Sequence, residues 1–495
     1  QVQMEVKQVA VVDVINSNKM KNSIIIIFTF CSILGFSQVK DSTEVTYKKR
    51  VLESIEVDFL MSYYKQNGIH SAVSGGIGSE KLTDLTSNIV VAMPLNDDDV
   101  LTIDAGISAY TSASSSNINP FNASGASGGG GDDDDRAATG PTGTPWQASS
   151  GASAQDVYAS VVANYSHSSD DRTLVWNADV AFSNEYDYTS IGFGGGIAKL
   201  FNDKNSEVSL KVNAYLDQWR PIYPTELHEY ASYGSGFQSN GYFSGVTILD
   251  QNGNASTAYL PSAYKNWEST NRNSYSASFG FSQVATKKMQ FSVFFDVLSQ
   301  SGMLSTPYQR VYFADKANYY IGEAQYIPVY ATSQNQGVYQ LADDIERLPG
   351  TRFKIPVGAR LNYYLNERVS IRSYYRYYWD DWGVTSHTAS IELPVKLSDK
   401  FTIYPSYRYY TQGKAKYFAP FETHLSTEKY YTSDYDLSTF NANQYGFGVG
   451  YTDIFTNAKI WKFGLKNIDF RYSHYDRNDG LNANIVSFGI KFVEQ

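Results

Sequence analysis

The charged side chains that recur at every second residue are the best candidates for functional residues in this sequence. Six basic residues hold such positions in three late segments: Arg352, Lys354, Arg360, Arg372, Arg376 and Arg408. Seven acidic residues hold them in earlier segments: Glu56, Asp58, Asp104, Asp179, Glu207, Asp217 and Asp296. Opposed basic and acidic walls around a water-filled lumen would orient polar solutes and set ion preference. The alternative is that these charges pair with one another in a plugged lumen and hold loops in place.

A run of four carboxylates is the one candidate metal site. Asp132, Asp133, Asp134 and Asp135 follow a glycine-rich stretch, and flexible carboxylates can wrap a hard cation such as Ca²⁺. The run lacks the alternating ligand spacing and the closing Glu of a calcium loop. A solvated acidic loop is therefore the plainer interpretation, and no cofactor is predicted.

A catalytic site is not predicted. The nearest constellation runs from Asp380 to His387 and includes Ser386. Neighbouring residues on a strand point to opposite faces, so Ser386 and His387 cannot act as partners there. A hydrolase on the barrel rim remains a third hypothesis, which His387→Ala would test.

The elements that carry these residues are long strands with one apolar and one polar face. Over 351–363, every odd position is apolar from Phe353 to Tyr363, and the even positions include three basic residues. The same pattern recurs at 54–64, 100–110, 207–217, 369–379 and 481–492. Soluble strands average about 5–6 residues, whereas transmembrane strands need about 9–11. The pattern therefore predicts strands with lipid on one side and water on the other.

The number and spacing of these segments predict the architecture. About sixteen segments begin near residues 54, 85, 100, 155, 173, 191, 207, 271, 289, 351, 369, 386, 401, 439, 464 and 481. The connections alternate between short turns and long loops, apart from a few short ones late in the chain. We therefore predict an all-β chain whose residues 54–495 form a single transmembrane antiparallel up-and-down β-barrel, with short periplasmic turns and long extracellular loops.

Composition agrees with this prediction and excludes one function class. Aromatic residues make up 15% of the chain, with 41 tyrosines, although the mean hydropathy is only −0.35. A transmembrane barrel needs an apolar outer face, a wet inner face and aromatic girdles. The net charge of −10, without a basic patch, argues against nucleic-acid binding.

The N-terminal region predicts export. A short basic start at Met20 and Lys21 precedes an apolar run too short to span a bilayer, and small residues end it near Ser37. We expect residues 20–37 to be a signal peptide, 1–19 to lie upstream of the true start, and 38–53 to be a periplasmic segment. Cys31, the only cysteine, falls within the signal, so the mature chain has no thiol.

Several motifs resemble a known family. They are Tyr374–Thr388, Pro405–Gln412, Tyr417–Pro420, Leu304–Tyr308, Glu346–Pro349, Leu101–Ala105 and Ser124–Ser127. The chain resembles a family of Gram-negative proteins catalogued only as a domain of unknown function and regarded as outer-membrane barrels. The resemblance covers nearly all of the mature chain and is most specific over 304–420. The glycine–aspartate insertion departs from it, which leaves the conformation of that loop in doubt.

The resemblance also implies a cellular context. Members are often encoded beside a small lipoprotein, a thioredoxin-like protein and a flavin transferase, which implies a link to envelope redox traffic but assigns no catalytic residue. The leading hypothesis is porin-like passage of small polar solutes across the cell outer membrane. The alternative is a non-conducting structural or docking subunit whose partners, besides outer-membrane lipid, would be a lipoprotein or another envelope protein.

Overall fold

The computed structural model describes residues 50–112, 156–184, 188–261, 264–267, 270–329, 338–453 and 455–495. The predicted signal peptide at 20–37, residues 1–19 and most of segment 38–53 lie outside the described residues. So does the candidate cation loop Asp132–Asp135. In the described part of the chain, no helix is long and apolar enough to cross a membrane.

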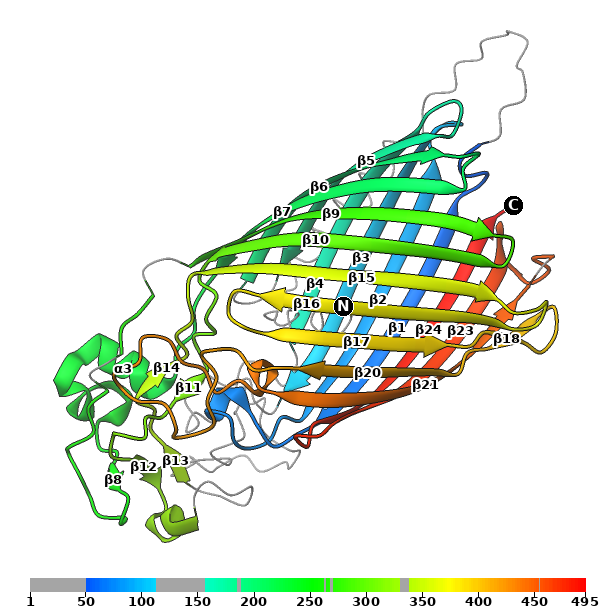
Figure 1. The fold of residues 1–495 in the computed structure, drawn as a ribbon. Helices are drawn as coiled ribbons and strands as arrows, with labels where there is room; N and C mark the ends of the chain where they lie inside the picture. The colour runs from blue at the N-terminus through cyan, green and yellow to red at the C-terminus, as the bar shows by residue number, and fades with distance from the viewer. Residues whose placement is uncertain are drawn as a thin grey trace.

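The chain forms a closed antiparallel β-barrel (Figure 1). Nineteen strands share one sheet, and three of them are short pieces, which leaves sixteen long strands. These are β1 (Glu56–Asn67), β2 (Leu82–Pro94), β3 (Asp99–Ser112), β4 (Asp156–Ser168), β5 (Leu174–Asn184), β6 (Tyr188–Phe201), β7 (Ser206–Trp219), β9 (Asn271–Thr286), β10 (Met289–Gly302), β15 (Thr351–Tyr364), β16 (Ser370–Asp380), β17 (Thr385–Glu392), β20 (Ser406–Gln412), β21 (Phe440–Thr452), β23 (Phe463–Arg477) and β24 (Asn482–Glu494). The predicted barrel of about sixteen strands is confirmed.

Closure comes from the pairing of the first and last strands. β1 and β24 run antiparallel from the Glu56–Val493 pair to the Asn67–Asn482 pair. A closed barrel leaves no unpaired sheet edge, which is what a strand structure in lipid requires. The predicted strand starts agree with the observed ones within a few residues, including glycine-rich β6 and β2, which ends at Pro94.

The three short pieces extend longer strands. β18 (Val395–Lys396) and β19 (Phe401–Ile403) continue β17 and β20 beyond Pro394 and Pro405, and β22 (Lys459–Ile460) forms a hairpin with the start of β23. A proline has no N–H to donate, so it interrupts a ladder at its position.

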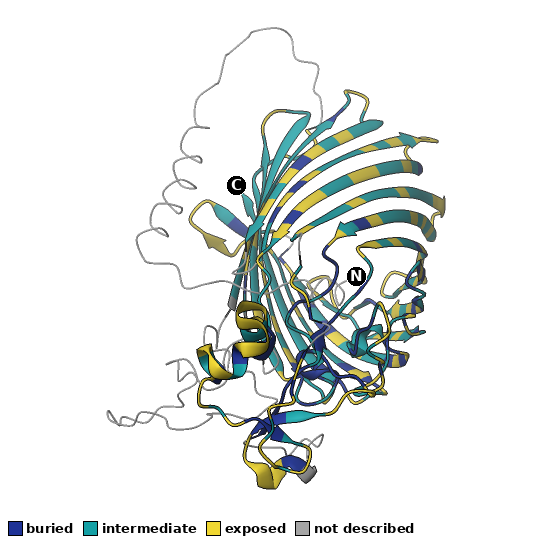
Figure 2. Ribbon diagram, turned by 90° about the vertical axis from the view of Figure 1, so that its left-hand side faces the viewer, coloured by how far each residue is buried: buried dark blue, intermediate teal, exposed yellow. Residues whose placement is uncertain are grey.

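The outer face of the barrel is an apolar belt. On β15 the exposed fractions of Phe353, Val357 and Leu361 are 37%, 42% and 38%, and the even-numbered residues between them point to the opposite face. The same alternation stripes the strands in Figure 2. Apolar side chains so exposed on nearly every strand would be unfavourable in water, and they match the lipid-facing band of transmembrane barrels.

The connections are sorted between the two ends of the barrel. One end, here the turn end, has the connections 95–98, 169–173, 202–205, 287–288, 365–369, 397–400 and 453–462. It also holds the C-terminus. The other, the loop end, has the long described connections 68–81, 220–270, 303–350 and 413–439, and the tight ones 381–384 and 478–481. This is the predicted sorting, including short loops late in the chain.

The long loops pack together into a cap at the loop end (Figure 1). The cap contains α3 (Thr225–Tyr233), five 3-10 turns (η1, Ala72–Ser74; η2, Gly234–Ser239; η3, Gly241–Phe243; η4, Ala324–Val329; η5, Tyr435–Leu437) and the short strands β8 (Leu249–Asp250), β11 (Arg310–Val311), β12 (Tyr319–Gly322), β13 (Val338–Gln340) and β14 (Asp344–Ile345). It has apolar cores of its own. One of them gathers Leu227, Tyr264, Tyr312, Ala342 and Ile345.

The cap reaches across the mouth of the barrel. Loop 68–81 joins β1 to β2, and loop 303–350 joins β10 to β15. Six long strands separate these two hairpins in either direction, so their loops start from opposite sides of the mouth. The two loops nevertheless meet. Gly75 lies so close to Tyr312 that a Cβ on this glycine would come within 2.7 Å of the ring.

Candidate functional site

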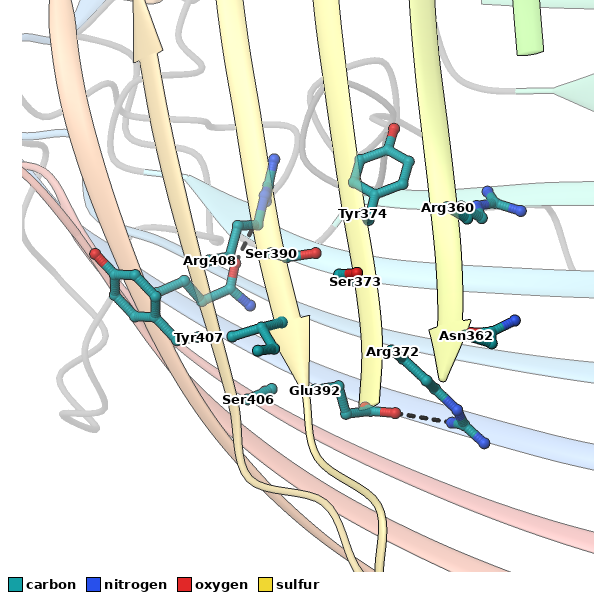
Figure 3. A pocket seen from close by; sticks show the side chains of 12 residues that line it. Arg360, Asn362, Arg372, Ser373, Tyr374, Ser390, Glu392, Ser406, Tyr407 and Arg408 are labelled. Atoms are coloured by element: carbon teal, nitrogen blue, oxygen red, sulfur yellow. Dashed lines mark hydrogen bonds and ion pairs between the residues drawn. The ribbon is translucent and has the colours of Figure 1, made fainter. Parts of the chain in front are cut away.

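Three of the six predicted basic residues line one recess in the barrel wall. Arg360, Arg372 and Arg408 surround a volume of about 330 Å³ (Figure 3). The other side chains on the lumen-facing phase of the alternation that line it are Asn362, Tyr374, Ser390, Glu392, Ser406 and Gln444. The recess is therefore cationic and rich in hydrogen-bond donors.

Strand register brings these residues together. Arg360 pairs across the sheet with Tyr374, Tyr374 with Ser390, Ser390 with Arg408, and Arg408 with Gln444. Paired residues in an antiparallel sheet point to the same face. The row thus crosses five neighbouring strands, although its members lie far apart in the sequence.

Arg360 is the most available cation of this row. Its guanidinium lies 5.6 Å from the Phe294 ring and 5.7 Å from the Tyr374 ring, and these two rings stack 6.0 Å apart. Among the described residues, no carboxylate forms an ion pair with Arg360. A guanidinium whose face lies on aromatic rings keeps its N–H edge for an oxyanion.

Glu392 neutralises another cation of the recess. Its carboxylate accepts from Arg372 at 2.8 Å, and from Arg471 of β23 at 2.6 Å. Arg471 passes over Gly448, where a Cβ would lie 3.0 Å from the arginine Cγ, and stacks on Tyr404. This network holds Arg372 at the edge of the recess and leaves Arg360 and Arg408 as its main positive charges.

The remaining predicted basic residues lie nearer the cap. Arg352 donates to Asp380 at 2.5 and 2.9 Å and stacks on Trp382 at 4.3 Å. Asp380 is fully buried and pairs across the sheet with Lys354. Arg376 is 8% exposed and interacts electrostatically with Asp296. Arg352 thus lies where β15 and β16 meet the base of the cap, and none of Arg352, Lys354 and Arg376 lines the recess.

Most of the predicted acidic residues have polar or cationic neighbours. Lys491 binds Glu56 at 2.5 Å and Asp58 at 3.1 Å, and Lys466 also binds Glu56. Asp104 accepts from Asn88, Asp179 lies 3.9 Å from Lys211, and Asp217 accepts from Ser190 and pairs across the sheet with Arg272. Glu207 pairs across the sheet with Ser282.

The sequence analysis placed the charges on two opposed walls, and the structure corrects this picture in two respects. Asp296 lies on β10, directly beside β15, and therefore belongs next to the basic residues. Charges of both signs are also interleaved on β1, β23 and β24. The barrel-strand cations that sequence reasoning left out include Lys211, Arg272, Lys466, Arg471, Arg477 and Lys491. That any of these residues lines a conducting pore stays a prediction.

The Ser386 and His387 pair lies on opposite faces of β17. Ser386 is buried at 2% exposure, whereas His387 is exposed and its Nδ1 lies 2.8 Å from the Tyr375 hydroxyl on the outer face. The two side chains therefore cannot act together, as the alternation predicts.

One buried carboxyl group connects two loops of the cap, and a second, partly buried one lies within loop 303–350. Glu346, 3% exposed, accepts from the Thr306 N–H at 2.6 Å and from the Thr432 hydroxyl at 2.5 Å, which ties loop 303–350 to loop 413–439. Burial raises the pKa of Glu346 to about 8. Burial likewise raises the pKa of Asp343 to about 7, although its carboxylate accepts from the Phe313 N–H. Both groups favour the protonated form inside the cap.

A closed sixteen-strand barrel with an apolar belt and a charged interior defines the class of transmembrane β-barrels. Within that class, the chain belongs to the family described as "Protein of unknown function (DUF3570)", which matches residues 26–484. No curated protein matches the chain.

Solved structures with the same kind of architecture are only distantly similar. A "Bacterial polysaccharide outer membrane secretin" is 10% identical, with a TM-score of 0.38 over 89% of this chain and 99% of that one. The "TodX monoaromatic hydrocarbon channel deltaS2 mutant" is 7% identical, with a TM-score of 0.37 over 90% and 91%. The "outer membrane protein opdK from Pseudomonas aeruginosa" is 7% identical, with a TM-score of 0.34 over 89% and 99%. The fold assigned here rests on the strand pairing and not on these likenesses.

Proposed function

We propose that this protein is an integral outer-membrane barrel that binds small anionic solutes in its lumen and passes them across the membrane. The observation that carries the proposal is the recess at Arg360, Arg372 and Arg408, in which Arg360 has no carboxylate partner among the described residues. The turn end would face the periplasm and the cap would face outward, as in other barrels with short turns and long loops.

An anion is the solute class that this recess suits. The neighbouring Tyr374, Ser390, Asn362 and Gln444 supply hydrogen-bonding groups around the arginines. Guanidinium groups bind carboxylates and phosphates in a bidentate manner, and barrels of 16–18 strands leave room for an aqueous path. A binding site on the wall, rather than a uniform charge, would select solutes with both an anionic and a polar end.

The cap would control access to this path. Loops from opposite sides of the mouth meet at Gly75 and Tyr312, so solutes must pass around the cap or wait for it to open. The buried contacts of Glu346 between two of the loops make opening a cooperative event.

Planar-bilayer recordings of the purified protein test the proposal. We expect anion-preferring conductance, and Arg360→Met should lower the anion-to-cation permeability ratio several-fold. Lys288→Met, which removes the same charge from an exposed turn, is the matched control and should leave the ratio unchanged. Passage is contradicted if neither the wild-type protein nor the cap-weakened Gly75→Ala variant conducts.

A second function is supported by the same cap. Loops interlocked across the mouth would suit a non-conducting barrel that presents its cap, or its periplasmic turns, to a lipoprotein or another envelope protein. A stoichiometric partner that co-purifies at native expression levels, together with no conductance in the capped or the weakened form, would favour this function over passage.

A further inference from the structure

The connection between β21 and β23 is the most apolar of the turns at the turn end. Phe455, Ile460 and Trp461 are 73%, 67% and 85% exposed. Figure 2 shows the short hairpin of β22 and β23 beside the C-terminus, standing out from the barrel wall. Other turns at this end are built from polar residues such as Asn96–Asp99 and Asn202–Asn205. A set of large apolar side chains with this exposure is unfavourable in water and indicates contact with lipid or another protein.

This hairpin is held firmly in place. Its two strands pair through Lys459 with Gly464 and Ile460 with Phe463. The Leu465 N–H donates to the Ala458 carbonyl at 2.7 Å, and the Gln495 N–H donates to the Lys462 carbonyl at 3.0 Å. The three apolar side chains are therefore presented by a braced element that includes the end of the chain.

The backbone of the hairpin is strained at two non-glycine residues with positive φ. Trp461 has a φ of 56° and Thr456 a φ of 49°. A left-handed backbone costs a residue with a Cβ roughly 1–2 kcal/mol, and it is a marked outlier for β-branched Thr. Glycine or asparagine would normally occupy such a tip. A strained turn that holds an exposed indole points to a role for its outward surface.

The chemistry of the surface matches a lipid headgroup region. Lys459 is exposed at its edge and has no ion pair among the described residues, whereas Lys462 pairs with Glu494 and its ammonium lies 5.5 Å from the Trp461 ring. Indole rings beside lysines are typical of the membrane–water interface. The hairpin also continues the apolar belt, because the strands that it connects carry Phe447 and Phe470 on their outer faces, 50% and 46% exposed.

We propose that Phe455, Ile460 and Trp461 insert into the headgroup–acyl boundary of the periplasmic leaflet, and that Lys459 favours anionic phospholipid there. This inference rests on the membrane location given under the proposed function. The hairpin would act as an anchor that fixes the depth and tilt of the barrel near β21 and β23.

Tryptophan quenching by brominated phospholipids tests the insertion. The full-length protein is reconstituted in vesicles of phosphatidylcholine and phosphatidylglycerol with bromines near the headgroup or near the chain end. The emission that disappears in Trp461→Phe is the emission of Trp461. Bromines near the headgroup should quench this emission more than bromines near the chain end, and the quenching should increase with phosphatidylglycerol content. Lys459→Gln should abolish the dependence on phosphatidylglycerol.

Trp176→Phe provides the matched control, because Trp176 lies on the outer face of β5 and is 40% exposed. If removal of Trp176 takes away quenched emission and removal of Trp461 does not, the anchor is refuted while the membrane location stands. If neither residue contributes quenched emission, the proposed membrane function itself fails. A Trp461 that lipid does not quench but that is shielded from acrylamide would indicate a protein partner on the hairpin, which also overturns the lipid anchor.

Discussion

Glu346→Gln tests whether the cap closes through a protonated carboxyl group. Glu346 has a usual pKa of 4.5, which burial raises to about 8 in the closed cap. At about 1.36 kcal/mol per pH unit, this rise corresponds to about 5 kcal/mol of cap stability. Because the closed cap binds the proton more tightly than an open one, this stability is fully present below pH 4.5. It is lost as the pH rises to about 8.

Glutamine cannot ionise, and it keeps one oxygen that can accept from the Thr306 N–H and an amide N–H that can donate to the Thr432 hydroxyl oxygen. We therefore expect the open population of the wild-type cap to rise with pH by up to about tenfold per pH unit from this group. Asp343 adds its own contribution between its usual pKa of 3.8 and about 7. In the Glu346→Gln variant, the rise of the open population with pH should be smaller by the contribution of one titrating group. This variant should also be more stably closed than the wild-type cap at neutral pH.

Hydrogen exchange of peptides from loops 303–350 and 413–439, corrected for intrinsic rates, measures the opening at pH 5 to 8. Glu323→Gln, at an exposed position in the same loop, is the matched control and should retain the wild-type slope. An unchanged pH slope in Glu346→Gln would show that this carboxyl group does not link the cap loops as described.

Three other substitutions follow from the same contacts. Asp380→Ala leaves Arg352, whose side chain is only 15% exposed, without its partner and should cost about 3–5 kcal/mol of unfolding free energy. This loss should appear as a lower midpoint of thermal unfolding, and an unchanged midpoint would mean that the Arg352–Asp380 pair does not stabilise the folded protein. Gly75→Ala should loosen the cap, because the new Cβ meets the Tyr312 ring, and exchange in loop 68–81 should rise well above that of Gly245→Ala, where a Cβ meets nothing. Equal exchange in the two variants would contradict the contact between Gly75 and Tyr312 across the mouth. Trp461→Asn relieves the strained turn and should raise the unfolding midpoint in detergent by an amount equivalent to roughly 1 kcal/mol, whereas a lower midpoint would show that the indole packs against the protein.

The barrel could be predicted from the sequence because its signal is local. Period-2 alternation places Phe353 and Arg352 on opposite faces whatever the rest of the chain does, and the strand ends coincide with polar turns. The same alternation also marks Glu392, Arg471 and Lys491 as lumen-facing, so these residues could have been included among the predicted charges. They lie apart from the densest runs of charge in the sequence.

The cap and the recess could not be predicted in this way. The Glu226–Arg310 ion pair and the bond between Thr432 and Glu346 join loops whose sequences carry no periodic pattern. The recess depends on the register of five strands, which sets Arg360 and Arg408 in one row. Register follows from the turns and from pairing between strands, and a single sequence does not give the resulting distances.

The contact between Gly75 and Tyr312 has a consequence for biogenesis. Loop 68–81 belongs to the first hairpin of the chain and loop 303–350 to a hairpin that lies opposite it only when the sheet is fully curved. An open sheet that has not yet joined β1 to β24 holds these loops too far apart to meet. This contact can therefore form only after the sheet has curved, and protease resistance of loop 68–81 would report that the seam between β1 and β24 has closed.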